Sequence, residues 1–480
     1  MDTQANSIVA MGPSTGSARP MAAVIGLWLT LVLGCTPYSP DPLLDSDFHA
    51  VASEREKVDA EHGSAELSLT KAAEWLRRRG PRVREALARY RTALARAGVR
   101  SAWPNPGISL GPQFGFGPNV DINKVAPFVN LGVTIPLSGR LAKQDDVNAA
   151  VAEAARVDAL ATFRELYLEL RARYLRLAIA REREVVRAGV LKGAAASMAA
   201  ADDLVVAGTA TALDVSLFQL EHARERSRML GAKLATSNAA ADLSDLVAVS
   251  AARLGVLPEA ALPSLPEKVP PAQGLRDLIV REHPRLFRIR AEYEVAERQL
   301  HLEVTKQYPD LSFGPSFGVE TGERKAMFGL AFGVELPLFD RNQQAVAEAI
   351  KRREEVRTKY ESEANRILTA VERARATVAL VSAQSQIIRE QVLPAARANV
   401  EIARKSLTAG SATAIQLLDA ERSLRQVQLE AVAARLAEQL AWSDLEKAVG
   451  HPLVEFQADS RGGAGAPPRD LTDKRQGDGL

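Results

Sequence analysis

The side chains that bind metals or act as nucleophiles are few in this chain and lie far apart. The 480 residues include one cysteine and six histidines, His49, His62, His222, His283, His301 and His451. No two histidines have the i, i+4 spacing that places two imidazoles on one face of a helix, and none lies beside the cysteine. We therefore predict no metal site, no cofactor and no enzymatic activity, and we interpret the histidines as surface or packing residues.

The composition excludes several classes of protein. Lys and Arg number 61 against 59 Asp and Glu, so the formal charge of +2 gives no basis for binding nucleic acid. With 46% hydrophobic residues, 25% charged residues and a mean hydropathy of -0.10, the chain is too polar for a bundle of membrane helices. The same values make it too apolar for a disordered protein.

The single cysteine, Cys35, follows the only long apolar run without charge, residues 21–34. This run of 14 residues has the length of a signal-peptide core, whereas a membrane-spanning helix needs about 20. The residues Leu31-Val32-Leu33-Gly34-Cys35 resemble a bacterial lipobox, in which the cysteine becomes the lipid-modified first residue of the mature chain. An ordinary signal peptide with a chance cysteine is the alternative.

We accordingly expect residues 1–35 to be a signal peptide with a lipobox, and residues 36–65 to be a tether between the lipid and the fold. Thr36 stands where lipoproteins retained in the inner membrane typically carry aspartate, which favours the outer membrane. Because Arg19 is the only basic residue before the apolar run, Met11 is an alternative start.

Internal similarity indicates that the chain is a tandem duplication. Four segments recur in the same order 201 to 203 residues later: 81–82 at 284–285, 105–115 at 308–318, 131–137 at 332–338, and 207–213 at 409–415. Four ordered matches at nearly constant spacing are hard to obtain by chance. We predict a first repeat over residues 66–262, a second over 263–455, and a disordered Gly/Pro-rich tail over 456–480.

Each repeat contains two segments that alternate between apolar residues and small or polar ones. The predicted strands cover about residues 106–118, 125–137, 308–320 and 326–338. Strands of roughly ten residues with one apolar face and one small or polar face are typical of outer membrane barrels. Bacterial barrels begin at about eight strands, so four cannot close alone and several chains must contribute. A soluble four-stranded sheet is the alternative.

Long tracts rich in Ala, Arg, Glu and Leu follow both strand pairs and predict long helices. The predicted helices cover about residues 138–206, 211–254, 339–407 and 413–449. Pro394 is the only proline in the two long tracts, and it indicates a kink. Each tract ends at a glycine, Gly208 or Gly410, and the residues Thr211–Asp214 and Thr413–Gln416 are typical of capping boxes at the start of the returning helices.

The duplicated order of strand pair, long helix, glycine turn and returning helix, behind a lipobox, resembles the TolC-like outer membrane efflux family over roughly residues 66–452. The segment Leu336-Pro337-Leu338-Phe339-Asp340-Arg341-Asn342-Gln343 is similar to the strand exit of the CzcC/CusC-type heavy-metal efflux branch. The resemblance implies a mainly α fold with a β-barrel contribution. Three chains with four strands each would share a twelve-stranded outer membrane barrel, continued by a periplasmic α-helical barrel. The implied partners of this homotrimer are a periplasmic adaptor, an inner-membrane RND pump and outer membrane lipid.

The resemblance also assigns roles to residues. The turns at Gly208 and Thr209 and at Gly410 and Ser411 correspond to periplasmic tips that contact the adaptor. Asp419, Gln416 and Asp214 lie where aspartates form a channel constriction in some members, and Gln416 departs from that pattern. Three copies of Asp419 around an axis would repel one another and favour a bound cation. The alternatives are a solvated carboxylate for Asp419 and helix capping for Asp214 and Gln416.

Glu320 and Glu335 fall on the polar side of the predicted strands and are expected to line the barrel lumen, if only as a solvated wall. We predict a passive trimeric duct in the outer membrane that exports heavy-metal cations. Drug or small-molecule efflux and type I secretion are the alternatives. A periplasmic adaptor lipoprotein fits less well because it would carry one helical hairpin, and a coiled-coil scaffold would lack the strand pairs.

Overall fold

The structure is a computed structural model that describes residues 38–61, 67–113, 126–206, 211–251, 254, 262–319, 326–409 and 411–454. Cys35 and the rest of the predicted signal peptide lie outside these residues, as do the predicted tail 456–480 and Gly208, Thr209, Gly410 and Glu320. The chain divides into two compact units, Met1–Glu56 and Lys57–Leu480. The described part of the first unit, from Tyr38 onward, is exposed and includes the start of helix α2 (Asp45–Glu61).

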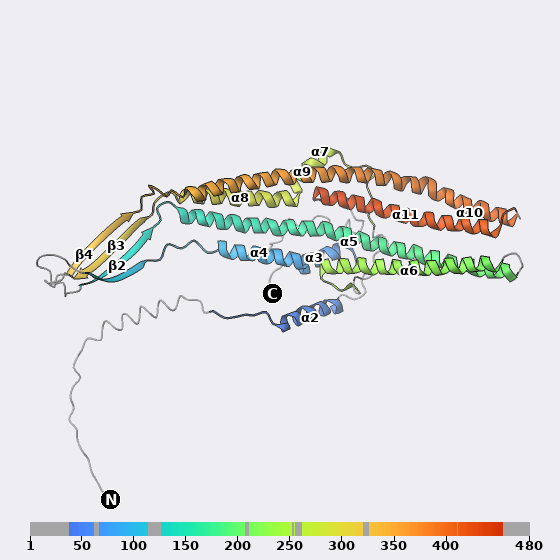
Figure 1. Ribbon diagram of the computed structural model, residues 1–480, viewed down its shortest axis with the longest axis horizontal. Coiled ribbons are helices and arrows are strands. Elements are labelled where there is room, and N and C mark those ends of the chain that lie inside the picture. The colour runs from blue at the N-terminus through green and yellow to red at the C-terminus, as the bar shows by residue number, and fades with distance from the viewer. Residues whose placement is uncertain are drawn as a thin grey trace, which may run out of the picture. The chain divides into compact units, whose positions relative to one another are not determined.

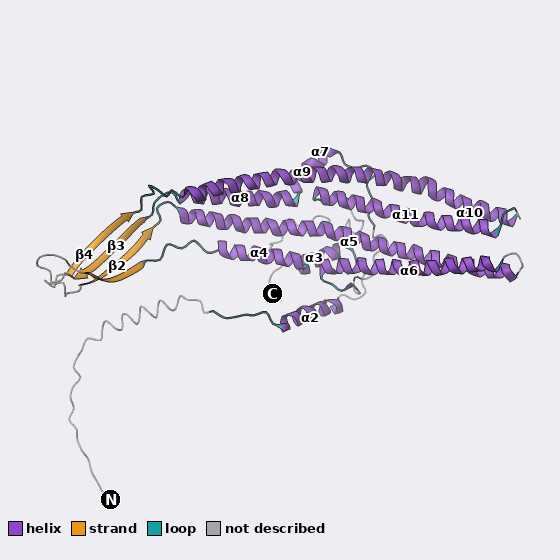
Figure 2. Cartoon of the chain, viewed as in Figure 1, coloured by secondary structure: helices purple, strands orange, loops and turns teal. Residues whose placement is uncertain are grey.

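The second unit contains two successive sets of elements in the same order (Figure 2). The first set is α3 (Leu69–Arg79), α4 (Pro81–Ala97), β1 (Gly107–Gln113), β2 (Ala126–Ile135), α5 (Arg140–Val206) and α6 (Ala212–Val247). The second set is α7 (Ala272–Glu282), α8 (Pro284–Thr305), β3 (Leu311–Val319), β4 (Ala326–Val334), α9 (Gln343–Ile387), the π-turn η2 (Ile388–Val392), α10 (Leu393–Thr408) and α11 (Ala414–Val449).

Each long helix packs against two shorter helices that follow one another along its length. In Figure 1, α5 lies against α4 on the side of the sheet and against α6 toward its other end, at Val206. Helices α9 and α10 lie in the same way against α8 and α11. The sheet and the far ends of the two helical hairpins, at Val206 and Ser411, are therefore at opposite ends of this unit. No helix in the described part of the chain combines the length and the apolar composition that a membrane span requires.

The strands form one antiparallel sheet in the order β1-β2-β3-β4. On one face, apolar residues pair across the strands and are exposed, among them Leu110, Val129, Phe317 and Phe328. On the other face, Ser109, Asn130, Ser316 and Gly329 follow one another across the sheet. A Cβ at Gly329 would lie 2.6 Å from the hydroxyl oxygen of Ser316, which would have to rotate away. The exposed apolar face indicates a partner that is not water.

The strands of the second repeat are shorter than the alternation predicts. β3 begins at Leu311 instead of about 308, and β4 ends at Val334 instead of about 338. Pro309 lies two residues before β3 and Pro337 three residues after β4, and neither has an N–H to donate to a neighbouring strand. β1 is described to Gln113, and residues 114–125 lie outside the described part.

Two helices also differ from their predicted form. α6 ends at Val247 instead of about 254, where Ala248 adopts φ 55° and the hydroxyl of Ser244 donates to the carbonyl of Val249. The long helix of the second repeat contains the π-turn Ile388–Val392, which ends two residues before Pro394. Because Pro394 has no N–H for the carbonyl four residues earlier, the wider turn accommodates it at the place where the sequence predicts a kink.

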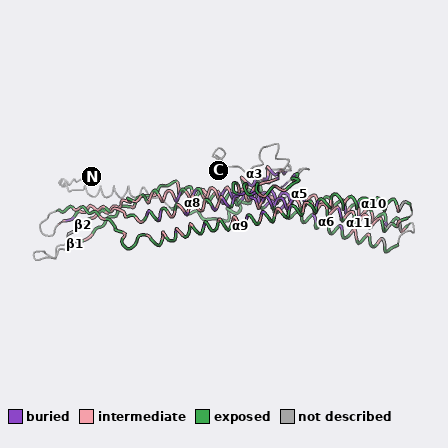
Figure 3. Tube along the Cα trace, turned by 90° about the horizontal axis from the view of Figure 1, so that it is seen from above, coloured by how far each residue is buried: buried purple, intermediate pink, exposed green. Residues whose placement is uncertain are grey.

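Buried residues gather in the middle of the unit (Figure 3), in one large cluster for each repeat. The first cluster includes Trp75 of α3 and Tyr174 of α5, and the second includes Leu275 of α7 and Trp442 of α11. Each cluster joins the short helix before the strands to the long helices after them. The core of each repeat thus fixes its own elements.

A buried ion pair, Arg171–Glu446, joins the two repeats. The side chains are 2% and 3% exposed, and Arg171 of α5 donates to both carboxylate oxygens of Glu446 of α11 at 2.7 and 3.0 Å. Arg171 also donates to the carbonyl of Val454, while the N–H groups of Leu453 and Val454 donate to Glu446 at 2.8 and 2.9 Å. Both charges therefore have several partners, as buried charges require.

Removing one member of this pair should destabilise the protein more than removing both. Glu446→Leu leaves the Arg171 guanidinium buried without its carboxylate, and we expect a loss of about 3 to 5 kcal/mol. The double variant Arg171→Met/Glu446→Leu replaces both charges with apolar side chains and should recover most of that loss. Thermal unfolding in detergent compares the variants; a double variant as unstable as the single one would contradict the expectation.

His283, between α7 and α8, is 4% exposed and packs against the end of α11. Gly450 ends that helix with φ 76°, and a Cβ there would lie 2.8 Å from the imidazole ring, so the close contact requires glycine. Burial lowers the pKa of His283 from 6.5 to about 4; Arg285 lowers it further and Glu363 opposes the change. The folded protein therefore holds this imidazole neutral.

We expect stability to fall as the pH falls from 6.5 to about 4, because in that window the unfolded chain binds a proton at His283 that the folded chain excludes. The full effect is about 3 kcal/mol per chain. Replacing His283 with Gln should flatten the pH dependence of the unfolding midpoint. The control His301→Gln, at an exposed residue of α8, should leave it unchanged; equal slopes for both variants would count against the assignment.

Candidate functional site

Both long helices leave the sheet through a residue with a left-handed backbone. Gly139 (φ 72°) precedes α5 and Asn342 (φ 56°) precedes α9, and these residues are 203 positions apart, the spacing of the repeats. Glycine adopts this conformation freely, and asparagine is enriched in it among the other residues. These two turns set the direction in which the helices continue from the sheet.

At the first exit, Arg140 donates to both carboxylate oxygens of Asp310, at 2.8 and 3.3 Å. This ion pair couples the start of α5 to the residue just before β3. The N–H of Ser101 donates to Asp145 at 2.8 Å, which holds the segment before β1 against α5. Hydrogen bonds from Ser101 hold the pKa of Asp145 below its usual value.

At the second exit, the segment from Leu336 to Gln343 folds into a compact turn. The N–H of Asn342 donates to the carboxylate of Asp340 at 2.9 Å, and the N–H of Arg341 donates to the side-chain oxygen of Gln343 at 2.7 Å. The Arg341 side chain donates to the carbonyl of Pro337 at 3.1 Å. The polar residues of this motif thus bond to one another and shape the turn.

Asn342 also binds the end of α8. Its side-chain amide donates to the carbonyl oxygen and to a carboxylate oxygen of Glu303, both at 2.9 Å. Burial opposes the ionisation of Glu303, but hydrogen bonds from Lys306, Asn342 and Gln299 outweigh it and hold the pKa of this carboxyl below its usual value. The sequence analysis did not predict this contact. The sign of it in the sequence is that the second repeat has Asn342 where the first repeat has Gly139.

The turn of the second repeat is described on both sides of Gly410. The N–H and hydroxyl of Ser411 donate to the carbonyl of Ser406 at 2.9 and 3.1 Å. Thr413 and Gln416 form a reciprocal capping box, with distances of 3.3 and 2.8 Å. The side chain of Gln416 therefore caps α11, and the side chain of Asp214 lies outside the described part.

Asp419 is exposed on α11 and lines a small cavity of about 170 Å³ between α5, α6 and α11. Leu217 and Phe218 give the cavity an apolar side, and Arg422 on its rim donates to Glu221 of α6 at 3.1 Å. No ion pair reaches Asp419 from a described residue. Its carboxylate is thus open to solvent in the single chain.

The polar face of the sheet has no arrangement that suggests catalysis. The pattern Gly-x-Ser-x-Gly occurs at 107–111 and 314–318, but hydrolases need it at a turn from strand to helix, and here both copies lie inside strands. Glu335, just beyond β4, is exposed. Among the residues that the structure describes, no group of three His, Cys, Asp or Glu could hold a metal ion.

Duplicated strand pairs on long helical hairpins, with an exposed apolar face on the sheet, define a TolC-like channel subunit. Residues 275–451 match a family model described as "Outer membrane efflux protein". The resemblance seen in the sequence is therefore confirmed.

The chain is similar to the cobalt-zinc-cadmium resistance protein CzcC of Cupriavidus metallidurans, with 26% identity over 305 residues that cover 62% of this chain and 71% of the relative. A crystal structure of CusC has the same fold, with a TM-score of 0.64 at 17% identity over 81% of this chain and 93% of that one. The outer membrane protein VceC of Vibrio cholerae gives 0.63 at 18% identity, over 80% and 96% of the two chains.

Two substitutions at Asn342 should separate its backbone role from its side-chain role. Asn342→Gly keeps the left-handed turn and loses the bonds to Glu303, and we expect a loss of about 1 to 2 kcal/mol. Asn342→Ala loses the bonds and also strains the backbone, which should add about 1 kcal/mol. The midpoint of thermal unfolding should therefore decrease in the order wild type, Asn342→Gly, Asn342→Ala. An alanine variant more stable than the glycine variant would refute the backbone role.

Proposed function

We propose that this protein is the outer membrane channel of a tripartite efflux system and that it exports heavy-metal cations as a passive duct. The observation that carries the proposal is the four-stranded sheet with its exposed apolar face and its glycine- and serine-rich opposite face. Lipid would cover the apolar face, and the small polar face would line a water-filled lumen.

The edges of the sheet support a trimer. In the described strands, β1 and β4 are each paired on one side only. If β4 of one copy pairs with β1 of the next, three copies close a twelve-stranded barrel without free edges. The helical hairpins of the three copies would then continue the duct as a periplasmic α-helical barrel.

The remaining assignments follow from the resemblance to the outer membrane efflux proteins. Cys35 would carry the lipid anchor in the outer membrane. The tips at Gly208, Thr209, Gly410 and Ser411 would contact a periplasmic adaptor, which links the duct to an inner-membrane RND pump. Asp419 from three copies would form a constriction that favours cations, and Glu320 and Glu335 would line the lumen. Energy comes from the pump, since the duct itself needs no catalytic residue.

The metal cargo is supported by similarity to CzcC, a cobalt-zinc-cadmium resistance protein. Drug or small-molecule efflux is the second candidate, because a duct accepts what its pump delivers and the fold alone does not select a substrate. Type I secretion would use the same duct architecture with a different pump.

A deletion strain tests the function directly. Growth is measured across divalent and monovalent metals, dyes, detergents and antibiotics, with the wild-type gene returned as the control. We expect hypersensitivity to metals alone. Sensitivity to organic compounds alone would contradict the metal cargo and leave the duct in place, whereas unchanged growth with all compounds would argue against an efflux role.

The same strain tests the tip. Gly410→Trp should fail to restore growth because a bulky side chain at the tip blocks contact with the adaptor, while Gly410→Ala should restore most of it. Both variants must reach the membrane as trimers at wild-type levels. Full restoration by a well-expressed tryptophan variant would exclude Gly410 from the adaptor contact.

A further inference from the structure

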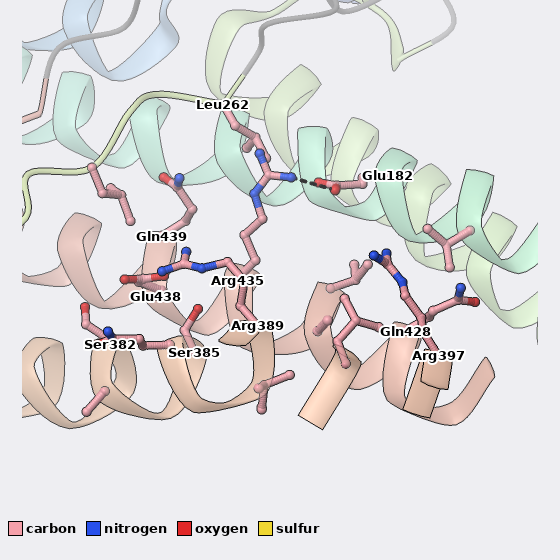
Figure 4. A pocket seen from close by; sticks show the side chains of 18 of the residues that line it. Glu182, Leu262, Ser382, Ser385, Arg389, Arg397, Gln428, Arg435, Glu438 and Gln439 are labelled. Carbon is pink, nitrogen blue, oxygen red and sulfur yellow. Dashed lines mark hydrogen bonds and ion pairs between the residues drawn. The ribbon is translucent and has the colours of Figure 1, made fainter. Parts of the chain in front are cut away.

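A groove of about 1670 Å³ lies between the two repeats, and none of the residues proposed for the duct lines it. Its lining comes from α5, from α9, the π-turn and α10, from α11, and from the segment 262–269. Figure 4 shows Ser382, Ser385 and Gln439 at one end of the groove and Gln428 and Arg397 at the other. Apolar side chains, including Val190, Leu265 and Ile388, also line the groove.

Two buried side chains of α11 that line this groove each have a buried polar atom without a partner. Gln439 is 4% exposed; its Nε2 donates to the carbonyl of Pro263 at 3.1 Å, which fixes the amide, and its Oε1 has no partner in the described structure. Trp442 is 2% exposed, and its Nε1 has no partner either. An unpaired buried donor or acceptor costs about 1 to 3 kcal/mol, so a bound group that satisfies both would be favoured.

A cationic side chain lines the same groove. Arg389, in the π-turn, lines the same groove and is one turn from the buried Ser385. Its guanidinium is 3.9 Å from the carboxylate of its neighbour Glu390, too far for a hydrogen bond. Arg435, by contrast, forms an ion pair with Glu182 at 2.8 Å across the groove (Figure 4). Arg389 is therefore the guanidinium that remains available to an anion at this end.

We propose that this groove binds a small organic anion with an apolar body. Its carboxylate or phosphate lies at Arg389, its body lies on the apolar wall, and a hydroxyl meets Gln439 and Trp442. One hydroxyl can donate to the Gln439 oxygen and accept from the Trp442 N–H at the same time. The charge-assisted bond at Arg389 supplies affinity, and the hydroxyl supplies specificity. The proposal is independent of the cargo and partners proposed for the duct.

Three related probes test both ends of the site on the full-length trimer in detergent. They are p-hydroxycinnamate, cinnamate, which lacks the hydroxyl, and p-hydroxycinnamyl alcohol, which lacks the carboxylate. In calorimetric titrations we expect saturable binding, with p-hydroxycinnamate roughly tenfold tighter than either of the others. Arg389→Gln should weaken p-hydroxycinnamate about tenfold and leave the alcohol unchanged. Trp442→Phe should weaken p-hydroxycinnamate a few-fold and leave cinnamate unchanged.

Arg366 provides a matched control. It lies on α9, has the same exposure as Arg389 at 66%, pairs with a nearby glutamate and does not line the groove. Arg366→Gln should bind all three probes as the wild type does. The proposal is overturned if no probe binds saturably, as would follow if water alone fills the groove or a neighbouring copy covers it. Equal affinity for the three probes, or equal losses in the Arg366 and Arg389 variants, would also overturn it.

Discussion

The buried pair Arg171–Glu446 is the interaction on which the joining of the two repeats depends. Each repeat has its own apolar cluster, and helices packed by apolar side chains alone tolerate some sliding. A bidentate guanidinium-carboxylate contact is directional and fixes one register. Because the same groups also bind Leu453 and Val454, the chain after α11 is held at this point as well. We infer that the pair selects how α5 lies against α11 rather than adding much net stability.

Ion pairs nearer the sheet extend this alignment. Arg288 of α8 donates to Asp158 and Glu165 of α5, and Arg164 of α5 donates to Glu282 at the end of α7. These pairs are partly exposed, so each contributes modestly. Together with Arg171 they form a series of polar contacts between the repeats along α5.

The two repeats have diverged where they leave the sheet and along their long helices. Gly139 and Asn342 adopt the same backbone conformation, yet only Asn342 adds side-chain bonds to the preceding helix. α5 is described as one helix of 67 residues, whereas its counterpart is interrupted by the π-turn before Pro394. The groove with its unpaired polar atoms lies beside that π-turn. The two repeats thus share a scaffold and differ in local features.

The sequence predicted the fold where a local pattern determines it. Alternation marks the strands, and tracts without proline mark α5 and α9, because periodicity and missing breakers act within one element. Contacts between elements have no such pattern: nothing near Arg171 indicates a partner 275 residues away. The sequence allows two roles for Gln416, in a channel constriction or as a helix cap. The reciprocal bonds with Thr413 show that its side chain caps α11. The tips, the lipid anchor and the lumen remain predictions, because they depend on residues outside the described part or on other copies.

The unpaired edges of β1 and β4 have a consequence for genetics. In the proposed trimer each copy closes the barrel by lending one edge to each neighbour, so the last step of folding is also assembly. A copy whose helices fold but whose β1 or β4 edge is defective would still enter trimers. The barrel of such a mixed trimer could not close, although the other copies are normal. When both forms are expressed together, intact trimers become a small minority. Such alleles would therefore behave as dominant, whereas mutations that prevent the helices from folding would behave as recessive.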